Sequence, residues 1–357
     1  MRILYKVGAL FSAVLIVVAS LVGCGSPNSE ERTRTVTDIM GAEVEIPTEV
    51  DEVINLYPFG CQMMAGLGLE DYLVGISEDT IETGWIEEMC PKIKDIPTYS
   101  DEVSAETLLA ANPDIVFCGD PDYAEELRGK GVPCITFAYL SIDDLKFNVR
   151  LLGEVLGDDA KEKCDLYLQY LDEQIADVHD ALDGVITERE TMHYINAAND
   201  KGFYKTAGAG STTDYCAQLS FVDLSTAPLI EFPESKVDPE ALLATDPENV
   251  IIGGRYQHVI YDDILAADEW QHIAAIENGN VFKIPMGLSA WNRYSLETAL
   301  LIPWTASVVY PDQYEFDAVH ETIEFYKTFM GYELTEEQAQ YMIEGLTPLG
   351  EKEISSR

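Results

Sequence analysis

The stretch DDAKEKCDLYLQYLDEQIADVHDAL, residues 158–182, decides the fold. Its apolar side chains recur at alternating steps of four and three, at Cys164, Leu168, Leu171, Ile175, Val178 and Leu182. This spacing places them on one face of a helix, and no Gly or Pro interrupts the segment between Gly157 and Gly184. A helix over these residues would be about 37 Å long at roughly 1.5 Å per residue, longer than most small domains are wide. We therefore predict one long helix, which is either an ordinary surface helix or a rod that joins two lobes.

A second pattern occurs once on each side of this helix. SAETLLAANPDIVFCG covers residues 104–119, and DPEALLATDPENVIIGG covers residues 238–254. In each copy a glutamate, Glu106 or Glu240, precedes Leu-Leu-Ala, and a proline and then a glycine follow at matching distances. The proline ends a helix, and the aliphatic run after it is typical of a strand buried in a sheet. The repetition favours a rod between two similar lobes over a surface helix.

Helical segments alternate with apolar strands on both sides of the long helix, which indicates parallel α/β lobes. We predict an α/β fold in which two Rossmann-like lobes are joined by one long α-helix. The expected N-terminal lobe covers residues 35–141 and begins with a β-hairpin, and the helical linker covers residues 142–184. The expected C-terminal lobe covers residues 185–346, and residues 347–357 are expected to be disordered.

The composition excludes one class of partner. The chain has 357 residues, of which 47% are hydrophobic, enough for two domains with cores of their own. Its 64 acidic and 22 basic residues give a formal net charge of −42. A nucleic acid is not an expected partner, because little in the chain would neutralise phosphates. The acidity is spread along the sequence and is typical of a solvated, self-repelling surface.

The N-terminal segment has the features of an export signal. The apolar run at residues 7–21 follows a basic start and is short for a helix that spans a membrane. The tetrapeptide Leu-Val-Gly-Cys that ends at Cys24 resembles the bacterial lipobox, in which the cysteine is acylated after cleavage. We expect residues 1–23 to be a lipoprotein signal peptide, Cys24 to be lipidated, and residues 24–34 to be a flexible tether. The mature protein would then be extracytoplasmic and anchored to the cell membrane by lipid.

Six further cysteines leave their chemistry open. They are Cys61, Cys90, Cys118, Cys134, Cys164 and Cys216. An even number in an exported protein is compatible with disulfides, and the wide spacings match no metal-binding motif. Buried free thiols explain the same pattern equally well.

Several motifs, taken in order, resemble one protein family. They are TVTDIMGAEVEIP (35–47), the two copies, NGNVFKIP (278–285), WNRYSLE (291–297) and GYELTEEQAQYMI (331–343). The chain resembles the solute-binding proteins of ABC importers in which one long helix joins two lobes, the class III periplasmic-binding-protein fold. That class serves iron–siderophores, haem, cobalamin and related chelates. The resemblance implies a monomer that is not an enzyme, has no cofactor, and works with an ABC permease and its ATPase.

The same resemblance implies a role for the glutamates of the two copies. In this family one glutamate per lobe pairs with arginines of the membrane permease, and the matching positions are Glu106 and Glu240. Two exposed carboxylates at equivalent places could form charge-assisted pairs with such arginines. They could also be ordinary acidic residues that the helix dipole favours at a helix start.

Candidate ligand contacts follow from the position of the strands. Ligands of open parallel sheets bind beyond the carboxyl ends of the strands. The candidates at these ends are Tyr57, Phe59, Trp85, Tyr123, Tyr139, Tyr204, Arg255, Tyr256, Trp291 and Arg293. Aromatic side chains suit a rigid organic chelate, although each one taken singly could be a packing residue. In so acidic a chain the two arginines point to an anionic ligand, or else to ion pairs with protein carboxylates.

Other anion and metal contacts receive less support. The turn Gly208–Thr213 supplies backbone N–H groups at a helix start, which is a second possible anion contact. We predict no bare metal site, because such a site needs several converging ligands. A metal already held by an organic ligand could still take His258 or Cys61 as an axial contact.

The sequence thus predicts capture of a metal chelate of the iron–siderophore, haem or cobalamin type between the lobes, followed by docking on the permease. We find none of the G-x-S-x-G, H-E-x-x-H or catalytic-cysteine signatures of enzymes. The alternatives are a small oxyanion or another metal species as ligand, or a lipoprotein that senses or delivers a ligand without a permease. Because a long helix bends little, we expect a small closure of the lobes.

Overall fold

The computed structural model describes residues 33–81, 83–100, 102–138, 141–198, 202–293 and 295–352. The predicted signal peptide, the lipidated Cys24 and most of the predicted tether lie outside these ranges. From Thr33 onward the chain forms one compact unit. Within the described ranges, no helix combines the length and the apolarity that crossing a bilayer requires.

The N-terminal lobe is built on a five-stranded parallel sheet in the order β5-β4-β3-β6-β7. Its strands are β3 (Val53–Asn55), β4 (Leu73–Ser77), β5 (Thr98–Tyr99), β6 (Ile115–Cys118) and β7 (Cys134–Thr136). Its helices are α1 (Pro58–Gly66), α2 (Trp85–Met89), α3 (Ala105–Ala111) and α4 (Pro121–Gly129), with 3₁₀ turns η1 (Glu70–Tyr72) and η2 (Pro91–Asp95). The predicted hairpin is present as the antiparallel pair β1 (Thr33–Thr37) and β2 (Glu43–Pro47).

The C-terminal lobe has a separate, four-stranded parallel sheet in the order β11-β10-β8-β9. Its strands are β8 (Thr191–Asn196), β9 (Asp223–Leu224), β10 (Asn249–Gly253) and β11 (Val281–Lys283). Its helices are α7 (Thr212–Leu219), α8 (Pro239–Leu243), α9 (Gln257–Ala266) and α10 (Ala274–Asn278), with the 3₁₀ turn η3 (Asp268–Trp270).

The two sheets share one connectivity. When the edge strand β5 is left aside, the first strand of each sheet lies between the second and the third, and the fourth pairs with the third. Thus β3 lies between β4 and β6 with β7 beside β6, and β8 lies between β9 and β10 with β11 beside β10. The two sequence copies form α3 and β6 in one lobe and α8 and β10 in the other. The predicted α/β fold with two similar lobes is confirmed.

The long helix has the bounds that the apolar period predicts, α6 (Asp158–Leu182), and it is preceded by α5 (Ile142–Leu156). Five of the six periodic side chains are buried, and Ile175 is partly buried against the same core. Gly153 allows α5 and α6 to pack closely, because a Cβ there would lie 2.9 Å from the Cα of Lys161. Gly157 makes the break between the two helices at φ 96°, a value that favours glycine.

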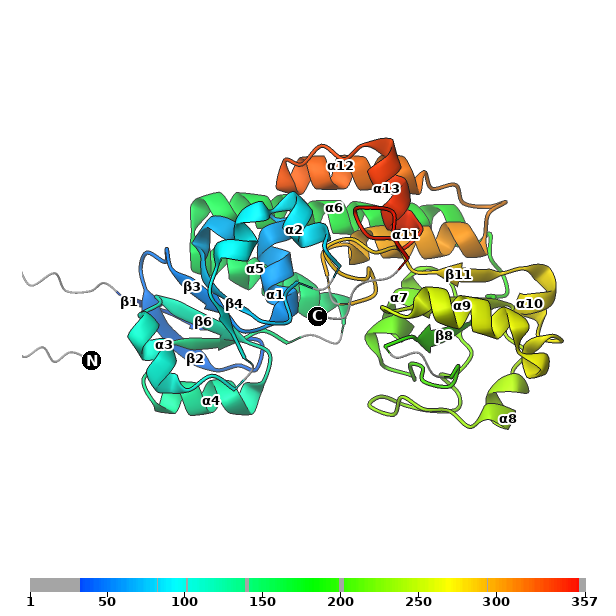
Figure 1. The fold of residues 1–357 in the computed structure, drawn as a ribbon, viewed down its shortest axis with the longest axis horizontal. Helices are drawn as coiled ribbons and strands as arrows, with labels where there is room; N and C mark the ends of the chain where they lie inside the picture. Colours follow the sequence, from blue (N-terminus) through cyan, green and yellow to red (C-terminus); the bar gives the residue numbers. More distant parts are fainter. Residues whose placement is uncertain are drawn as a thin grey trace, which may run out of the picture. The chain divides into compact units, whose positions relative to one another are not determined.

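Of the three C-terminal helices, α11 (Thr298–Val309) and α12 (Ala318–Met330) lie along the long helix, and α13 (Glu336–Ile343) packs against α12 (Figure 1). Helix α11 packs against α6, and α12 packs against α1 of the N-terminal lobe. Residues 318–330, which the sequence grouped with the C-terminal lobe, thus contact both α1 of the N-terminal lobe and α11. Residues 347–352, expected to be disordered, form a turn in which Thr347 N donates to Glu351 O at 3.0 Å.

Each sheet is buried on both faces, which explains the continuous apolar runs in its strands. On β6, Ile115 and Phe117 join a core that also contains α6 and reaches the C-terminal sheet, whereas Val116 and Cys118 join the outer core beneath α3 and α4. On β10, Ile251 joins the same core that contains α6, which we call the shared core. Val250 and Ile252 join a second outer core. The shared core is continuous from one lobe through α6 to the other.

The structure answers the open question about cysteines within the residues it describes. All six are buried free thiols. The Sγ atoms of Cys118 and Cys134, on neighbouring strands, lie 3.7 Å apart.

Candidate functional site

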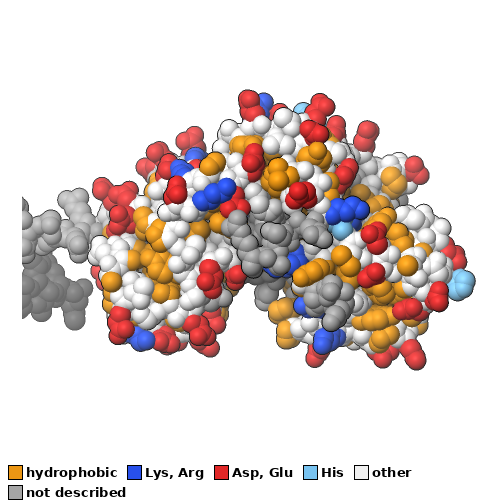
Figure 2. Space-filling view, viewed as in Figure 1, with side chains coloured by type: hydrophobic (Ala, Val, Ile, Leu, Met, Phe, Trp, Pro, Cys, Tyr) orange, Lys and Arg blue, Asp and Glu red, His pale blue; other side chains and the backbone are white. Residues whose placement is uncertain are grey.

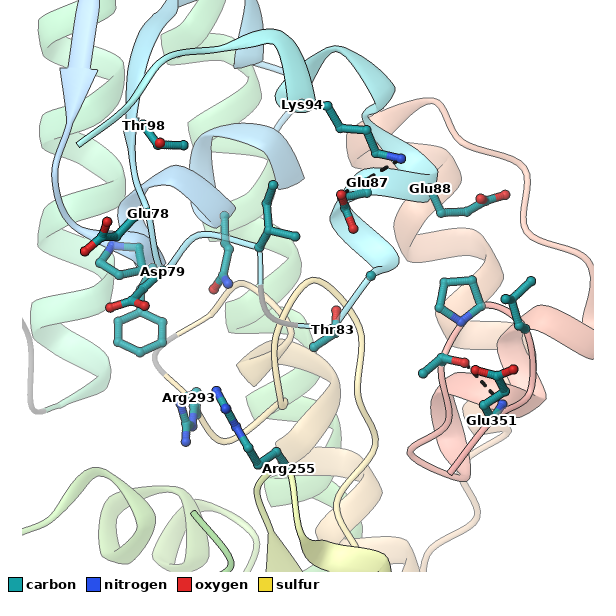
Figure 3. A pocket seen from close by; sticks show the side chains of 18 residues that line it. Glu78, Asp79, Thr83, Glu87, Glu88, Lys94, Thr98, Arg255, Arg293 and Glu351 are labelled. Atoms are coloured by element: carbon teal, nitrogen blue, oxygen red, sulfur yellow. Dashed lines mark hydrogen bonds and ion pairs between the residues drawn. The ribbon is translucent and has the colours of Figure 1, made fainter. Parts of the chain in front are cut away.

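A cavity of about 900 Å³ lies between the lobes and is lined by 18 residues (Figure 3). Its N-terminal wall comes from α1 and from the segment after β4, and its C-terminal wall comes from the segments after β10 and β11. The turn at residues 347–351 adds a third wall. The cavity thus lies where the carboxyl ends of parallel strands place a ligand. We call it the cleft.

A second hollow of about 350 Å³ adjoins the cleft, because Phe59 and Arg293 line both. It lies against the C-terminal lobe and is lined by Lys205, by Asn292 and by residues 211–213 at the start of α7. The glycine turn that the sequence marked as an anion contact is therefore placed beside Arg293.

Two arginines dominate the charge of the C-terminal wall. Arg255 follows β10, and Arg293 lies in the loop that precedes α11. Their side chains lie next to each other and extend into the cleft (Figure 3). Figure 2 shows acidic side chains over both lobes and far fewer basic ones, so a pair of arginines here is a local reversal of the surface charge. Guanidinium groups bind carboxylates and phosphates through paired N–H donors.

The N-terminal wall carries oxygen atoms. Glu78 and Asp79 follow β4 directly and are exposed. Gln62, on α1, is only 1% exposed, and its amide nitrogen donates to the carbonyl oxygen of Thr80 at 3.1 Å. Because only the nitrogen of this amide can donate to a carbonyl, the Oε1 atom is the end that remains. This Oε1 has no hydrogen-bond partner among the described residues.

Hydrogen bonds between segments far apart in the sequence join the two lobes at the cleft. Thr83 Oγ1, from the N-terminal lobe, donates to Gly287 O at 2.6 Å. Trp85 Nε1 donates to Leu346 O at 2.9 Å, next to the turn that forms the third wall. Sequence reasoning missed this turn, because the contact spans the chain and no local pattern signals it.

A buried carboxylate, that of Glu297, holds the loop that carries Arg293 through hydrogen bonds. Glu297 Oε1 accepts hydrogen bonds from Leu288 N and from the hydroxyl of Tyr326, both at 2.8 Å. Burial raises the pKa of Glu297 above its usual value. A Cβ at Gly287 would lie 2.0 Å from the Tyr326 hydroxyl, so the backbone approaches this group as only glycine permits.

Of the ten predicted ligand contacts, the structure brings Phe59, Arg255 and Arg293 together in the cleft. Tyr57 lies behind Phe59, with the two rings edge to face and their centroids 5.3 Å apart. Tyr139 lies outside the described residues.

The remaining aromatic candidates do not line the cleft. Trp85 and Trp291 are fully buried, so their indoles belong to the core. The Tyr123 hydroxyl donates to Val103 O, and the ring packs on the outer core of its lobe. Tyr204 and Tyr256 pack on the outer core of the C-terminal lobe. In the structure these side chains pack on the cores and do not line the cleft.

The two suggested axial metal contacts are also placed elsewhere. His258 Nε2 shares a hydrogen bond with Gly345 O at 2.9 Å, and burial lowers the pKa of this histidine. The Cys61 thiol donates to Asn55 O, and burial raises its pKa to about 11. Neither residue lines the cleft. In the part of the chain that the structure describes, no group of three or more His, Cys, Asp or Glu side chains could hold a metal ion.

Glu106 and Glu240 occupy the same position in the two lobes. Each is exposed and is the second residue of its helix, after a capping side chain that accepts a backbone N–H bond, Ser104 for α3 and Asp238 for α8. Both helices lie on the side of the molecule away from α12 and α13 (Figure 1).

Comparisons with known proteins agree with this architecture. The family model described as "Periplasmic binding protein" matches residues 53–287. YvrC of Bacillus subtilis (strain 168), described as an uncharacterized ABC transporter substrate-binding lipoprotein, is 20% identical over 329 residues, which cover 87% of this chain and 99% of that protein.

Two solved structures have the same fold. One is a periplasmic solute binding protein from Veillonella parvula DSM 2008, with a TM-score of 0.74, 23% identity, and coverage of 87% of this chain and 97% of that one. The other is the molybdate-binding protein MolA of a Haemophilus influenzae ABC transporter, solved with molybdate, with a TM-score of 0.73, 20% identity, and coverage of 85% and 99%.

Proposed function

The chain belongs to the periplasmic binding protein family, and from this premise we propose that it is the solute-binding lipoprotein of an ABC importer. It would be held outside the cytoplasmic membrane through Cys24. The observation that carries the proposal is the cleft between two separate parallel sheets, with ligand-accessible side chains on both walls. The description of the B. subtilis relative as a substrate-binding lipoprotein supports it.

For the ligand we propose a metal chelate of the iron–siderophore, haem or cobalamin type. A cavity of about 900 Å³ is the size that accommodates an organic molecule, and it far exceeds a bare oxyanion. Phe59 and Leu349 offer apolar contact, while Arg255 and Arg293 suit the anionic groups of such a chelate.

A small oxyanion is the second candidate ligand. The hollow of about 350 Å³ supports it, since Lys205, Arg293 and the start of α7 surround it with hydrogen-bond donors. MolA, which has this fold, was solved with molybdate.

The lobes are expected to close only slightly on a ligand. The shared core continues through α6, and Thr83 and Trp85 donate hydrogen bonds to the backbone at Gly287 and Leu346. Small-angle scattering of the protein before and after ligand addition should show little compaction; a large decrease in the radius of gyration would contradict a stiff connection.

Docking on the permease is proposed to use Glu106 and Glu240. Reversing both charges, with Glu106→Lys and Glu240→Lys, should abolish uptake in cells and leave ligand affinity of the purified protein unchanged. The matched control is a double reversal at two exposed glutamates elsewhere on the lobes, Glu125→Lys and Glu269→Lys. Normal uptake by the first variant would refute docking at these residues and favour a ligand-sensing lipoprotein.

A further inference from the structure

The two walls of the cleft have opposite hydrogen-bonding character. On the C-terminal side, Arg255 and Arg293 have only donors, as does Lys205 in the adjoining hollow. A ligand face that meets this wall must therefore supply acceptors, such as carboxylate, phenolate or phosphate oxygens.

The N-terminal wall presents acceptors. Glu78 and Asp79 lie across the cleft from the arginines (Figure 3), and ionised carboxylates only accept. Gln62 lines the same cavity, is 1% exposed, and keeps an Oε1 without a partner among the described residues. A buried acceptor that lacks a donor costs free energy, so a ligand donor at this atom would be stabilising.

The other charged side chains of the lining do not cancel this difference. Lys94 is the basic residue of the N-terminal lining, and its Nζ lies 3.9 Å from Glu87 Oε1. Glu88, on the same side, and Glu351, on the third wall, add further negative charge. The donors of the lining are thus concentrated on one wall and the acceptors on the other.

We propose that the cleft takes a mixed-charge ligand, with anionic groups against Arg255 and Arg293 and a positively charged group against Glu78, Asp79 and Gln62. The assignment rests on the proposed solute-binding function and narrows its substrate class. A purely anionic ligand of this size would place negative charge beside two carboxylates and leave Gln62 Oε1 without a donor. The positive group is either a protonated amine or the metal centre of a chelate with open coordination positions, since all three N-terminal groups offer oxygen ligands.

Three probes of similar size separate these possibilities in calorimetric titrations of the full chain. Tricarballylate has three carboxylates alone, nitrilotriacetate adds a protonated amine, and iron(III) nitrilotriacetate replaces the proton with a metal that has open positions. The variants are Glu78→Gln with Asp79→Asn, and Arg255→Ala with Arg293→Ala. The controls are Glu125→Gln and Arg150→Ala, which change exposed residues away from the cleft.

The wild type should bind at least one nitrilotriacetate probe about tenfold more tightly than tricarballylate, because one charge-assisted hydrogen bond contributes enough binding free energy for such a difference. The carboxylate variant should lose this preference, the arginine variant should weaken all three probes, and the controls should change neither. Tighter binding of iron(III) nitrilotriacetate than of metal-free nitrilotriacetate identifies the metal as the positive group. Tighter binding of metal-free nitrilotriacetate identifies the amine.

The proposal would be overturned if neither nitrilotriacetate probe bound more tightly than tricarballylate, whatever the absolute affinities. A preference that survives in the Glu78→Gln, Asp79→Asn variant would also overturn it. If tricarballylate binds as tightly as the nitrilotriacetate probes and this binding depends on Arg255 and Arg293, only the mixed-charge ligand is overturned and solute capture in the cleft stands.

Discussion

The strongest test of the fold concerns the buried face of the long helix. Leu171 is 0% exposed in the shared core, whereas Leu166 on the same helix is 47% exposed. Replacing Leu171 with alanine removes a fully buried side chain and should lower the free energy of unfolding by about 2–5 kcal/mol. The same substitution at Leu166 should change it by about 0.5 kcal/mol or less.

Urea unfolding followed by circular dichroism measures both variants under one protocol. Because the shared core runs through both lobes, we expect one cooperative transition whose midpoint falls in the Leu171→Ala variant and whose slope is unchanged. Equal losses at the two positions would refute the assigned helix face. Two separate transitions would show that the lobes fold independently and that the continuous core does not couple them.

Three further predictions concern single groups. Thr83→Val removes the donor to the Gly287 carbonyl and should lower the free energy of unfolding in urea by about 1–3 kcal/mol. It should also widen the cleft, measured as a larger radius of gyration in small-angle scattering. If neither quantity changes, the bond does not hold the lobes together. Ser104→Ala removes the α3 cap and should cost about 1 kcal/mol by the same urea assay, and a neutral result would contradict the cap. Burial lowers the pKa of His193 to about 4, so the folded protein resists its protonation and stability falls as pH drops from about 6.5 towards 4. In the His193→Asn variant the unfolding free energy should depend less on pH over this range than in the wild type. The control His272→Asn, at an exposed histidine, should keep the wild-type pH dependence. The same pH dependence in His193→Asn and in the wild type would contradict the prediction.

The sequence predicts the fold well because the relevant patterns are local. The apolar period of residues 158–182 and the two copies depend only on spacing, and both reappear as helices and strands with the expected roles. The third wall of the cleft could not be predicted, because it is fixed by a bond from Trp85 to Leu346 that no local pattern signals.

The candidate site was predictable only in part. Arg255 and Arg293 could be singled out because basic residues are scarce, whereas Glu78 and Asp79 lie in a strand-end segment that the sequence indicates but do not stand out by type among 64 acidic residues. Aromatic residues in strand-end loops are equally suited to packing and to ligand contact. Burial decides between the two roles, and burial at Trp291 depends on tertiary packing.

Native mass spectrometry of the protein purified from its own cells tests capture in the cleft most directly. We predict a non-covalent small-molecule adduct on the wild type that is lost in the Arg255→Ala, Arg293→Ala double variant and retained in Arg150→Ala. An adduct that persists unchanged in the double variant, or a wild type that carries none, would contradict the account.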